Sequence, residues 1–192
     1  MKSVDRVAAA RGIAAFLEAL GYDPSDSELV GTPERVTEAF ATELLRGERA
    51  DLAELVQSGS SEVPAKQHGL VLVRKIAVST VCPHHLLPAI GHADVAYQPG
   101  TRLLGLGTIT RLVDACARRL TLQESIAENV VTALREHGRA VGAYCRIELL
   151  HTCLVARGSE QTEARLVTSF ASGSLAGNGT SEVLQALKAS GA

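Results

Sequence analysis

Apolar side chains in the first part of the chain recur at the three- and four-residue spacing of an amphipathic helix. Residues 3–20 carry such a stripe, and Gly21 follows it as a helix stop. The stripe is made by Val7, Ala8, Ile13, Ala14, Phe16, Leu17 and Leu20. The spacing therefore predicts one helix over this segment.

The tetrapeptide Gly31-Thr32-Pro33-Glu34 predicts the start of a second helix, with the threonine as N-cap and the proline at the first helical position. We expect this helix to run to about Arg46 and to end at Gly47. A short helix is expected at 51–57. The Ser/Gly stretch 58–61 predicts a loop where a helical arm meets the main body.

From Leu70 onward the pattern changes to the two-residue alternation of β-strands. Residues 70–81 and 93–97 alternate, and Pro99-Gly100 after them predicts a turn. Residues 141–149 alternate cleanly, and 166–170 are predicted to form another strand. In the first strand we assign to one face Leu70, Leu72, Arg74, Ile76, Val78 and Thr80.

Helical spacing returns between the two pairs of strands. One helix is predicted at about 108–120, and a second begins at the capping box Thr121-Leu122-Gln123-Glu124 and ends near Gly138. A last short helix is expected at 181–189. The order strand-strand, helix-helix, strand-strand after a helical arm favours an α+β fold with an antiparallel sheet.

Length and composition indicate a single globular domain of residues 1–192, with 1–60 as the helical N-terminal arm and 61–192 as the body. The 192 residues are 46% hydrophobic and 21% charged, but only 3% are aromatic, so Leu, Val, Ile and Ala must build the core. The net charge of −2 provides no basic field for a nucleic-acid partner. An anionic substrate would need a local cluster of arginines.

The chain contains four cysteines, at positions 82, 116, 145 and 153. Two of them lie beside histidines, and the apolar stretch 4–20 carries four charged residues, so it is neither a signal peptide nor a membrane span. We therefore expect reduced thiols in a cytoplasmic protein and no membrane partner. Cys116 and Cys145 are expected to pack as small core residues.

Two clusters of cysteine and histidine suit a metal ion. In Cys82-Pro83-His84-His85, the first and last residues are three apart, so one turn can aim both at one ion. In His151-Thr152-Cys153, the outer residues are two apart and would share one face of a strand. Thiolate and imidazole are zinc ligands, and three such ligands with an open fourth position are typical of a catalytic site, whereas four are typical of a structural one.

Several motifs together resemble the GTP cyclohydrolase I family, in order and spacing from about Thr32 to Leu175. They are Cys82-Pro83-His84-His85-Leu86-Leu87-Pro88, Gly91, Tyr97-Gln98-Pro99, Gly105-Leu106, Arg111, Gln123-Glu124, and the octapeptide from His151 to Gly158. The resemblance implies a tunnelling fold, in which two helices back an antiparallel four-stranded sheet. It further implies a toroidal homodecamer with active sites between subunits.

The resemblance also implies an activity and roles for individual residues. Similar enzymes open the imidazole ring of GTP hydrolytically and form formate and 7,8-dihydroneopterin triphosphate, which feeds pterin and tetrahydrofolate synthesis and one-carbon metabolism. Carried over by position, zinc would be held by Cys82, His85 and Cys153, and protons would be moved by His84 and His151. Gln123 and Glu124 would form the base pocket, and the triphosphate would face Arg35, Arg111 and Arg157.

Elementary chemistry suits these roles. Zinc held by two thiolates and an imidazole can lower the pKa of a bound water towards ~7, for attack on the electrophilic C8 of a purine. Histidine, whose unperturbed pKa is ~6.5, can protonate the ring nitrogen N7. A carboxylate such as that of Glu124 can accept both N1–H and N2–H of guanine, a pair that adenine cannot offer. The same Glu124 would occupy the third position of the predicted capping box, a role that competes with base binding.

The departures from the family pattern concern phosphate binding. Glu38 stands where the family usually has lysine, Gly107-Thr108 where it has Ser-Lys, and Ser125 where it has arginine. Each charged hydrogen bond to phosphate contributes roughly 1.5–3 kcal/mol, so the triphosphate clamp is weakened. Arg35 could also simply pair with Glu38. Three hypotheses remain: a GTP cyclohydrolase with a thinner clamp, a related zinc hydrolase for a purine or pterin lacking the triphosphate, and a non-catalytic oligomer with structural zinc.

Overall fold

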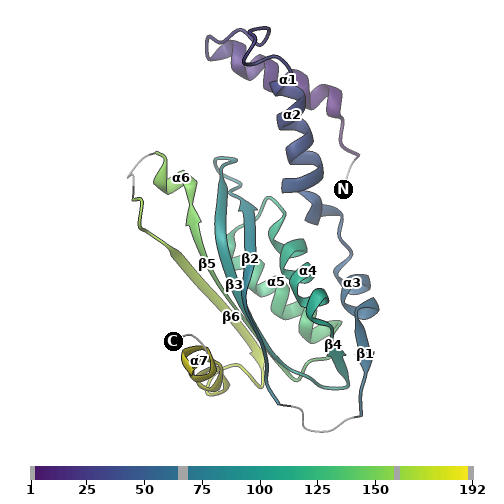
Figure 1. Ribbon diagram of the computed structural model, residues 1–192. Coiled ribbons are helices and arrows are strands. Elements are labelled where there is room, and N and C mark those ends of the chain that lie inside the picture. The colour runs from purple at the N-terminus through teal and green to yellow at the C-terminus, as the bar shows by residue number, and fades with distance from the viewer. Residues whose placement is uncertain (1–2, 65–68, 158–160, 190–192) are drawn as a thin grey trace.

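The computed structural model describes residues 3–64, 69–157 and 161–189, and Gly158 of the last motif lies outside them. A helical arm extends away from the sheet at the N-terminal end (Figure 1). It comprises α1 (Arg6–Ala19), α2 (Thr32–Glu38), the π-helical η1 (Ala39–Leu44) and the 3₁₀-helical η2 (Arg46–Arg49). The short helix α3 (Leu52–Ser58) connects it to the body.

The start of α2 differs from the prediction. The N-cap is Gly31, whose φ of 76° lies in the left-handed region that glycine adopts without strain, and Thr32 is already helical. The Thr32 hydroxyl instead accepts a hydrogen bond from Arg35 Nη2 at 2.8 Å. The loop predicted at 58–61 is also wrong in part, because β1 (Ser60–Glu62) pairs antiparallel with β4 (Arg102–Leu104).

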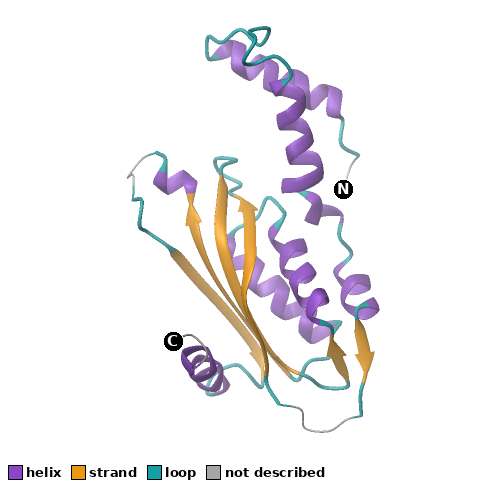
Figure 2. Ribbon diagram, viewed as in Figure 1, coloured by secondary structure: helices purple, strands orange, loops and turns teal. Residues whose placement is uncertain are grey.

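Four antiparallel strands form the main sheet in the order β2-β3-β5-β6. They are β2 (Val71–Val81), β3 (Pro88–Gln98), β5 (Gly142–His151) and β6 (Leu166–Gly173). Two helices, α4 (Leu106–Ala117) and α5 (Gln123–Glu136), cover one face, and α7 (Gly179–Ala189) lies on the other (Figure 2). The predicted α+β architecture, with an antiparallel four-stranded sheet backed by two helices, is confirmed.

The core lies between the sheet and the α4–α5 pair. It consists mainly of Leu, Val, Ile and Ala, as the composition predicts, with Tyr97 as its largest fully buried side chain. Cys116 and Cys145 are both fully buried in it, as expected. Among the described residues, no helix is long and apolar enough to cross a membrane.

A β-bulge in β2 overturns the predicted face assignment. The register pairs Val73 with Val95 and then Ile76 with Ala93, so the two residues between them oppose one residue of β3. The inserted residue shifts the alternation by one. Ile76 and Val78 therefore face the main core, whereas Leu70 and Leu72 pack into the smaller cluster beneath α7.

The capping box predicted for α5 is not formed. The N-cap is Leu122, without a side-chain hydrogen bond, and the helix begins at Gln123. The Thr121 hydroxyl lies 3.3 Å from Leu122 O rather than capping a backbone N–H. Glu124 is therefore free of the capping role that competed with its binding role.

Candidate metal centre and base pocket

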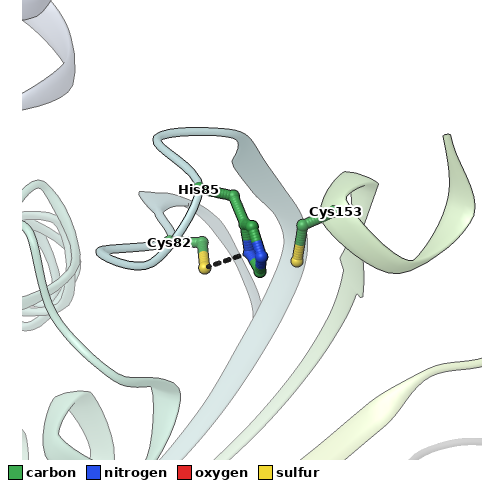
Figure 3. A group of neighbouring side chains, drawn as sticks. All are labelled: Cys82, His85 and Cys153. Atoms are coloured by element: carbon green, nitrogen blue, oxygen red, sulfur yellow. Dashed lines mark hydrogen bonds between the residues drawn. The ribbon is translucent and has the colours of Figure 1, made fainter. Parts of the chain in front are cut away.

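Cys82, His85 and Cys153 converge at one end of the sheet (Figure 3). Cys82 follows β2, His85 lies in the turn before β3, and Cys153 lies in α6 (Thr152–Val155) directly after β5. One ligand atom from each lies within 4.8 Å of the other two. The structure thus brings together one thiolate–imidazole pair and a second cysteine from distant segments.

The turn after β2 is closed by its own backbone. Cys82 N–H donates to Leu87 O at 2.9 Å, and Leu86 N–H donates to Cys82 O at 2.9 Å. Leu86 adopts a positive φ of 55°, which lets the chain reverse within this short segment. As a result the side chains of Cys82 and His85 lie side by side, with Sγ and Nδ1 3.7 Å apart.

Cys153 reaches the site by a different route from the one predicted. The sequence suggested that His151 and Cys153 share one face of a strand, but β5 ends at His151 and the chain turns into α6. The Thr152 hydroxyl donates to Pro88 O at 2.6 Å and so ties this turn to β3. The helical turn, rather than strand alternation, directs Cys153 towards Cys82.

The geometry of these donors fits a tetrahedral metal ion. With metal–sulfur and metal–nitrogen bonds of about 2.3 and 2.0–2.1 Å, two tetrahedral ligands stand about 3.6 Å apart. Cys82 Sγ and His85 Nδ1 are 3.7 Å apart. Burial and then the neighbouring Cys82 raise the pKa of the Cys153 thiol, and Arg157 partly offsets this effect. A bound cation would favour the thiolate in the same place.

The two remaining histidines lie beside this group and are not part of it. His84 Nδ1 is 3.9 Å from Cys82 Sγ, and its ring is exposed. His151 Nε2 is 2.8 Å from Gln123 Oε1. Burial lowers the pKa of His151, and the carboxylate of Glu124 partly opposes that shift.

Gln123 connects His151 to the sheet. Its Nε2 donates to Ile147 O at 3.1 Å and to Leu166 O at 3.0 Å, with Thr168 Oγ1 also at 3.1 Å. Because backbone carbonyls can only accept, these contacts define which end of the amide is nitrogen. Oε1 must then accept from His151 Nε2–H, so Nδ1 is the unprotonated nitrogen of the neutral ring.

A pocket of about 210 Å³ surrounds these groups. It is lined by the predicted residues Cys82, His84, His85, Gln123, Glu124, His151 and Cys153, and by Thr80, Pro83, Thr121, Leu122 and Leu166. Sequence reasoning missed the two leucines, which are 47% and 42% exposed and offer apolar surface to a flat ring. Leu122 could have been suspected from its place before Gln123-Glu124, whereas nothing in the sequence marks Leu166.

The three predicted phosphate-binding arginines are dispersed within one chain. Arg157 is close enough to Cys153 to influence the pKa of its thiol. Arg35 belongs to the arm, where it donates to Val30 O and Thr32 Oγ1. Arg111 lines a separate groove beside α4.

The substituted clamp positions have partners of their own. Glu38 forms an ion pair of 2.8 Å with Arg6 of α1. Thr108 is buried, and its hydroxyl donates to Gly59 O at 3.0 Å. Neither side chain is directed to the base pocket.

Comparisons with known proteins show what this chain resembles. A sequence profile of the family described as GTP cyclohydrolase I matches residues 9–188. The chain is 38% identical to GTP cyclohydrolase 1 of Leptospira biflexa over 157 residues, covering 82% of this chain and 84% of that protein. It is also 38% identical to the Leifsonia xyli enzyme of the same name over 181 residues, covering 92% and 91%. A solved dihydroneopterin aldolase from Burkholderia thailendensis, bound to guanine, matches with a TM-score of 0.37 at 10% identity, covering 64% of this chain and 98% of that one, too weakly to support any inference.

Proposed function

The chain belongs to the GTP cyclohydrolase I family, and we propose that it opens the guanine imidazole ring of GTP at a zinc centre, releasing formate and forming 7,8-dihydroneopterin triphosphate. The observation that carries the proposal is the convergence of Cys82, His85 and Cys153 in a pocket that also contains Glu124 and two histidines. The relatives are named for a reaction on GTP, and the pocket contains the side chains that such a reaction needs.

Zinc is the metal that this donor set favours. Two thiolates and an imidazole are soft or borderline ligands, which suit zinc better than magnesium or calcium. Among the described residues the group has three members, and three protein ligands are typical of a catalytic zinc. This count favours a catalytic centre over the purely structural zinc of the third hypothesis. Bound there, zinc would activate water for attack at C8 of the guanine.

His151 is proposed to move protons during ring opening. Its lowered pKa keeps the ring neutral at pH 7, and Gln123 occupies its Nε2–H, so Nδ1 can accept a proton from the attacking water. The same nitrogen can pass that proton on to N7 of the base, which must be protonated before the C8–N bond breaks. His84, exposed at the rim beside Cys82, is the proposed second proton carrier.

Glu124 is proposed to select guanine. Its carboxylate lies in the first turn of α5, is exposed, and lines the pocket beside the apolar surface of Leu122. Two carboxylate oxygens can accept N1–H and N2–H of guanine together. Adenine lacks this donor pair and would leave the carboxylate unpaired, so it would be rejected.

The oligomer and the compartment are also proposals. A pocket of about 210 Å³ is smaller than the ~300–1,000 Å³ of typical ligand sites. One chain therefore encloses little more than a base, which supports an oligomer whose neighbouring subunits complete each site. The number of ten subunits is taken from the family resemblance. The four cysteines are free, which suits a reducing cytoplasm. The proposed product would feed pterin and folate synthesis. Light scattering of the zinc-loaded protein would test for a decamer of 20.2 kDa chains.

A related zinc hydrolase that acts on a purine or pterin without the triphosphate is the second candidate. The supporting observation is that Glu38 and Thr108, which replace two lysines of the family pattern, bond to Arg6 and to Gly59 instead of offering positive charge. Substrate preference separates the two candidates.

Incubation of the zinc-loaded protein with GTP, GMP, guanosine and guanine, each in turn, tests the proposal. We expect formate and a fluorescent pterin from GTP, no product from ATP, and loss of product in Cys153→Ala but not in Cys116→Ala, a matched change at a buried cysteine outside the pocket. Turnover of guanosine or guanine in preference to GTP would support the second candidate. No product from any guanine compound would refute both.

A further inference from the structure

A wide groove lies between β2 and α4, separate from the base pocket. It measures about 610 Å³ and shares no lining residue with the pocket around the metal centre. Its lining includes four cationic side chains, Arg46, Arg74, Lys75 and Arg111, and one acidic side chain, Asp114. The groove is therefore a concentration of positive charge on a chain whose net charge is −2.

Two of the four cations are balanced within the chain. Arg46 forms a two-point contact with Asp114, at 2.9 and 2.7 Å. Arg74 Nε lies 3.7 Å from the buried carboxylate of Asp94. Within the described ranges, Lys75 and Arg111 take part in no ion pair, and the Arg111 guanidinium has only a 3.4 Å contact with Thr108 Oγ1. These two exposed cations, from a strand and a helix, are available to an anion.

The bulge in β2 presents Lys75 to the groove. Arg74 and Lys75 together oppose Asp94, and Lys75 has a φ of 52°, a conformation that residues other than glycine rarely adopt. Asp94, only 4% exposed, stabilises this conformation because its Oδ1 accepts the backbone N–H of Lys75 at 3.1 Å. Such a conformation persists only where the surrounding structure holds it, and here the buried carboxylate does so.

The first turn of α4 adds to the positive potential. This helix of 12 residues begins at Leu106, which lines the groove, and has no side-chain N-cap. Gly107 leaves the first turn uncovered, since a Cβ there would meet nothing nearer than Arg111 Nη1 at 3.7 Å. Backbone N–H groups and the helix dipole at such an end favour anionic oxygens.

We propose that Lys75 is a phosphate-binding residue, which supplies from the β2 bulge, together with Arg111, the ammonium that position 108 lacks. The ligand class is a polyphosphate, namely the triphosphate of a guanine nucleotide whose base lies in the pocket of a neighbouring subunit of the proposed oligomer. The inference rests on the proposed function, because that function identifies the polyphosphate as the substrate's tail. It also explains how a chain with Thr108 can retain GTP.

Calorimetric titration with inorganic tripolyphosphate tests the groove apart from the base pocket. We expect the wild type to bind and Lys75→Asn to weaken binding about tenfold, in line with the loss of one charged contact. Asparagine tolerates a positive φ, so the variant should keep the bulge. Arg139→Asn is the matched control, because Arg139 is also an exposed cation with a φ of 50° but does not line the groove. Lys75→Arg should restore most of the binding.

Kinetics provides a second readout. In Lys75→Asn the ratio of kcat/KM for GTP to kcat/KM for guanosine should fall about tenfold, mainly through the KM for GTP. Equal losses in Lys75→Asn and Arg139→Asn would show a general effect of net charge and overturn the proposal, as would failure of the wild type to bind tripolyphosphate. If the wild type opens no guanine compound, the proposed function fails, yet the tripolyphosphate titration still decides the role of Lys75.

Discussion

Gln123 is 2% exposed, and both ends of its side-chain amide form hydrogen bonds within the protein. The nitrogen bonds to carbonyls of β5 and β6, and the oxygen bonds to His151. The sequence places Gln123 beside Glu124 and so predicts that both lie in the base pocket, which both of them line. The partners that Gln123 bonds within the chain lie 24 to 45 residues further along, on strands whose alignment no local pattern defines. A motif can therefore locate a residue in a site, whereas its contacts depend on tertiary packing.

Replacing Gln123 by leucine should reduce catalysis more than binding. His151 would lose the acceptor that holds its Nε2–H, so kcat for GTP should fall about 10²-fold with little change in KM. The carbonyls of Ile147 and Leu166 would lose their donor, at a cost of about 1–3 kcal/mol in the free energy of unfolding. The ¹⁵N shifts of His151 should report loss of the Nε2–H tautomer. Unchanged shifts would contradict this role, and Gln57→Leu, at an exposed position on α3, is the control.

The buried thiol of Cys116 should make stability depend on pH in the alkaline range. Burial raises its pKa from 9.0 to about 12, so at pH 10 the unfolded chain releases this proton and the folded chain does not. The unfolded state is thereby favoured, and the free energy of unfolding should fall by about 1.4 kcal/mol one pH unit above the unfolded pKa. Urea unfolding at pH 8 and pH 10 should show a loss smaller by that amount in Cys116→Ala. Equal losses in the two proteins would contradict the assignment.

At the scale of the elements, periodicity predicts most helices and strands but not the irregular joints between them. The alternation in 141–149 corresponds to β5, whose Cys145, Ile147 and Leu149 face the main core. The stripe in 3–20 corresponds to α1, although no residue of this helix is buried. Three irregular segments leave no such pattern in the sequence: the bulge at Lys75, the π-helical η1 and the short α6. Each is a local departure from a regular strand or helix, and a regular periodicity cannot indicate where such a departure occurs. Two of these three joints lie in regions to which we assign a function, because α6 carries Cys153 and the bulge carries Lys75.

Asp94 should be essential to the bulge. Its carboxylate is buried between Arg74 and Arg146, at 3.7 and 3.6 Å, and also accepts Lys75 N–H. In Asp94→Asn the charge is lost while an acceptor remains, so Arg74 and Arg146 each lose one ion-pair contact, and Arg146 keeps its contact with Glu148. We expect a loss of about 2–3 kcal/mol in urea unfolding, somewhat below the 3–5 kcal/mol of a fully buried pair.

Asp114→Asn provides the contrast at the element scale. Asp114 also faces two arginines, Arg46 and Arg118, but its side chain is 33% exposed and that of Arg46 is 51% exposed. Because solvent screens such pairs, the expected loss is below about 1 kcal/mol. Equal losses in the two variants would show that Asp94 stabilises the bulge no more than an ordinary surface carboxylate would.

At the scale of the whole molecule, the metal centre joins two segments that lie far apart in the sequence. Cys82 and His85 belong to the β2–β3 connection, whereas Cys153 belongs to α6, which precedes the return strand β6. The residue types in the two motifs were sufficient to predict that these segments meet. The proposed oligomer comes from the family resemblance alone, because periodicity describes one chain and carries no information about the surfaces that copies share.

Metal removal should therefore change both thiol reactivity and stability. Cys116 and Cys145 are fully buried and their pKa values are raised by burial, so neither should react with an aromatic disulfide reagent in the folded protein. In the zinc-loaded protein Cys82 and Cys153 should be protected as ligands. A chelator should then expose these two of the four thiols and lower the melting temperature, since a metal that binds only the folded state stabilises it by mass action. Cys153→Ala should leave a single chelator-sensitive thiol. If the chelator changed neither the thiol count nor the melting temperature, the two motifs would not share an ion, and the hydrolytic role proposed for the pocket would lose its basis.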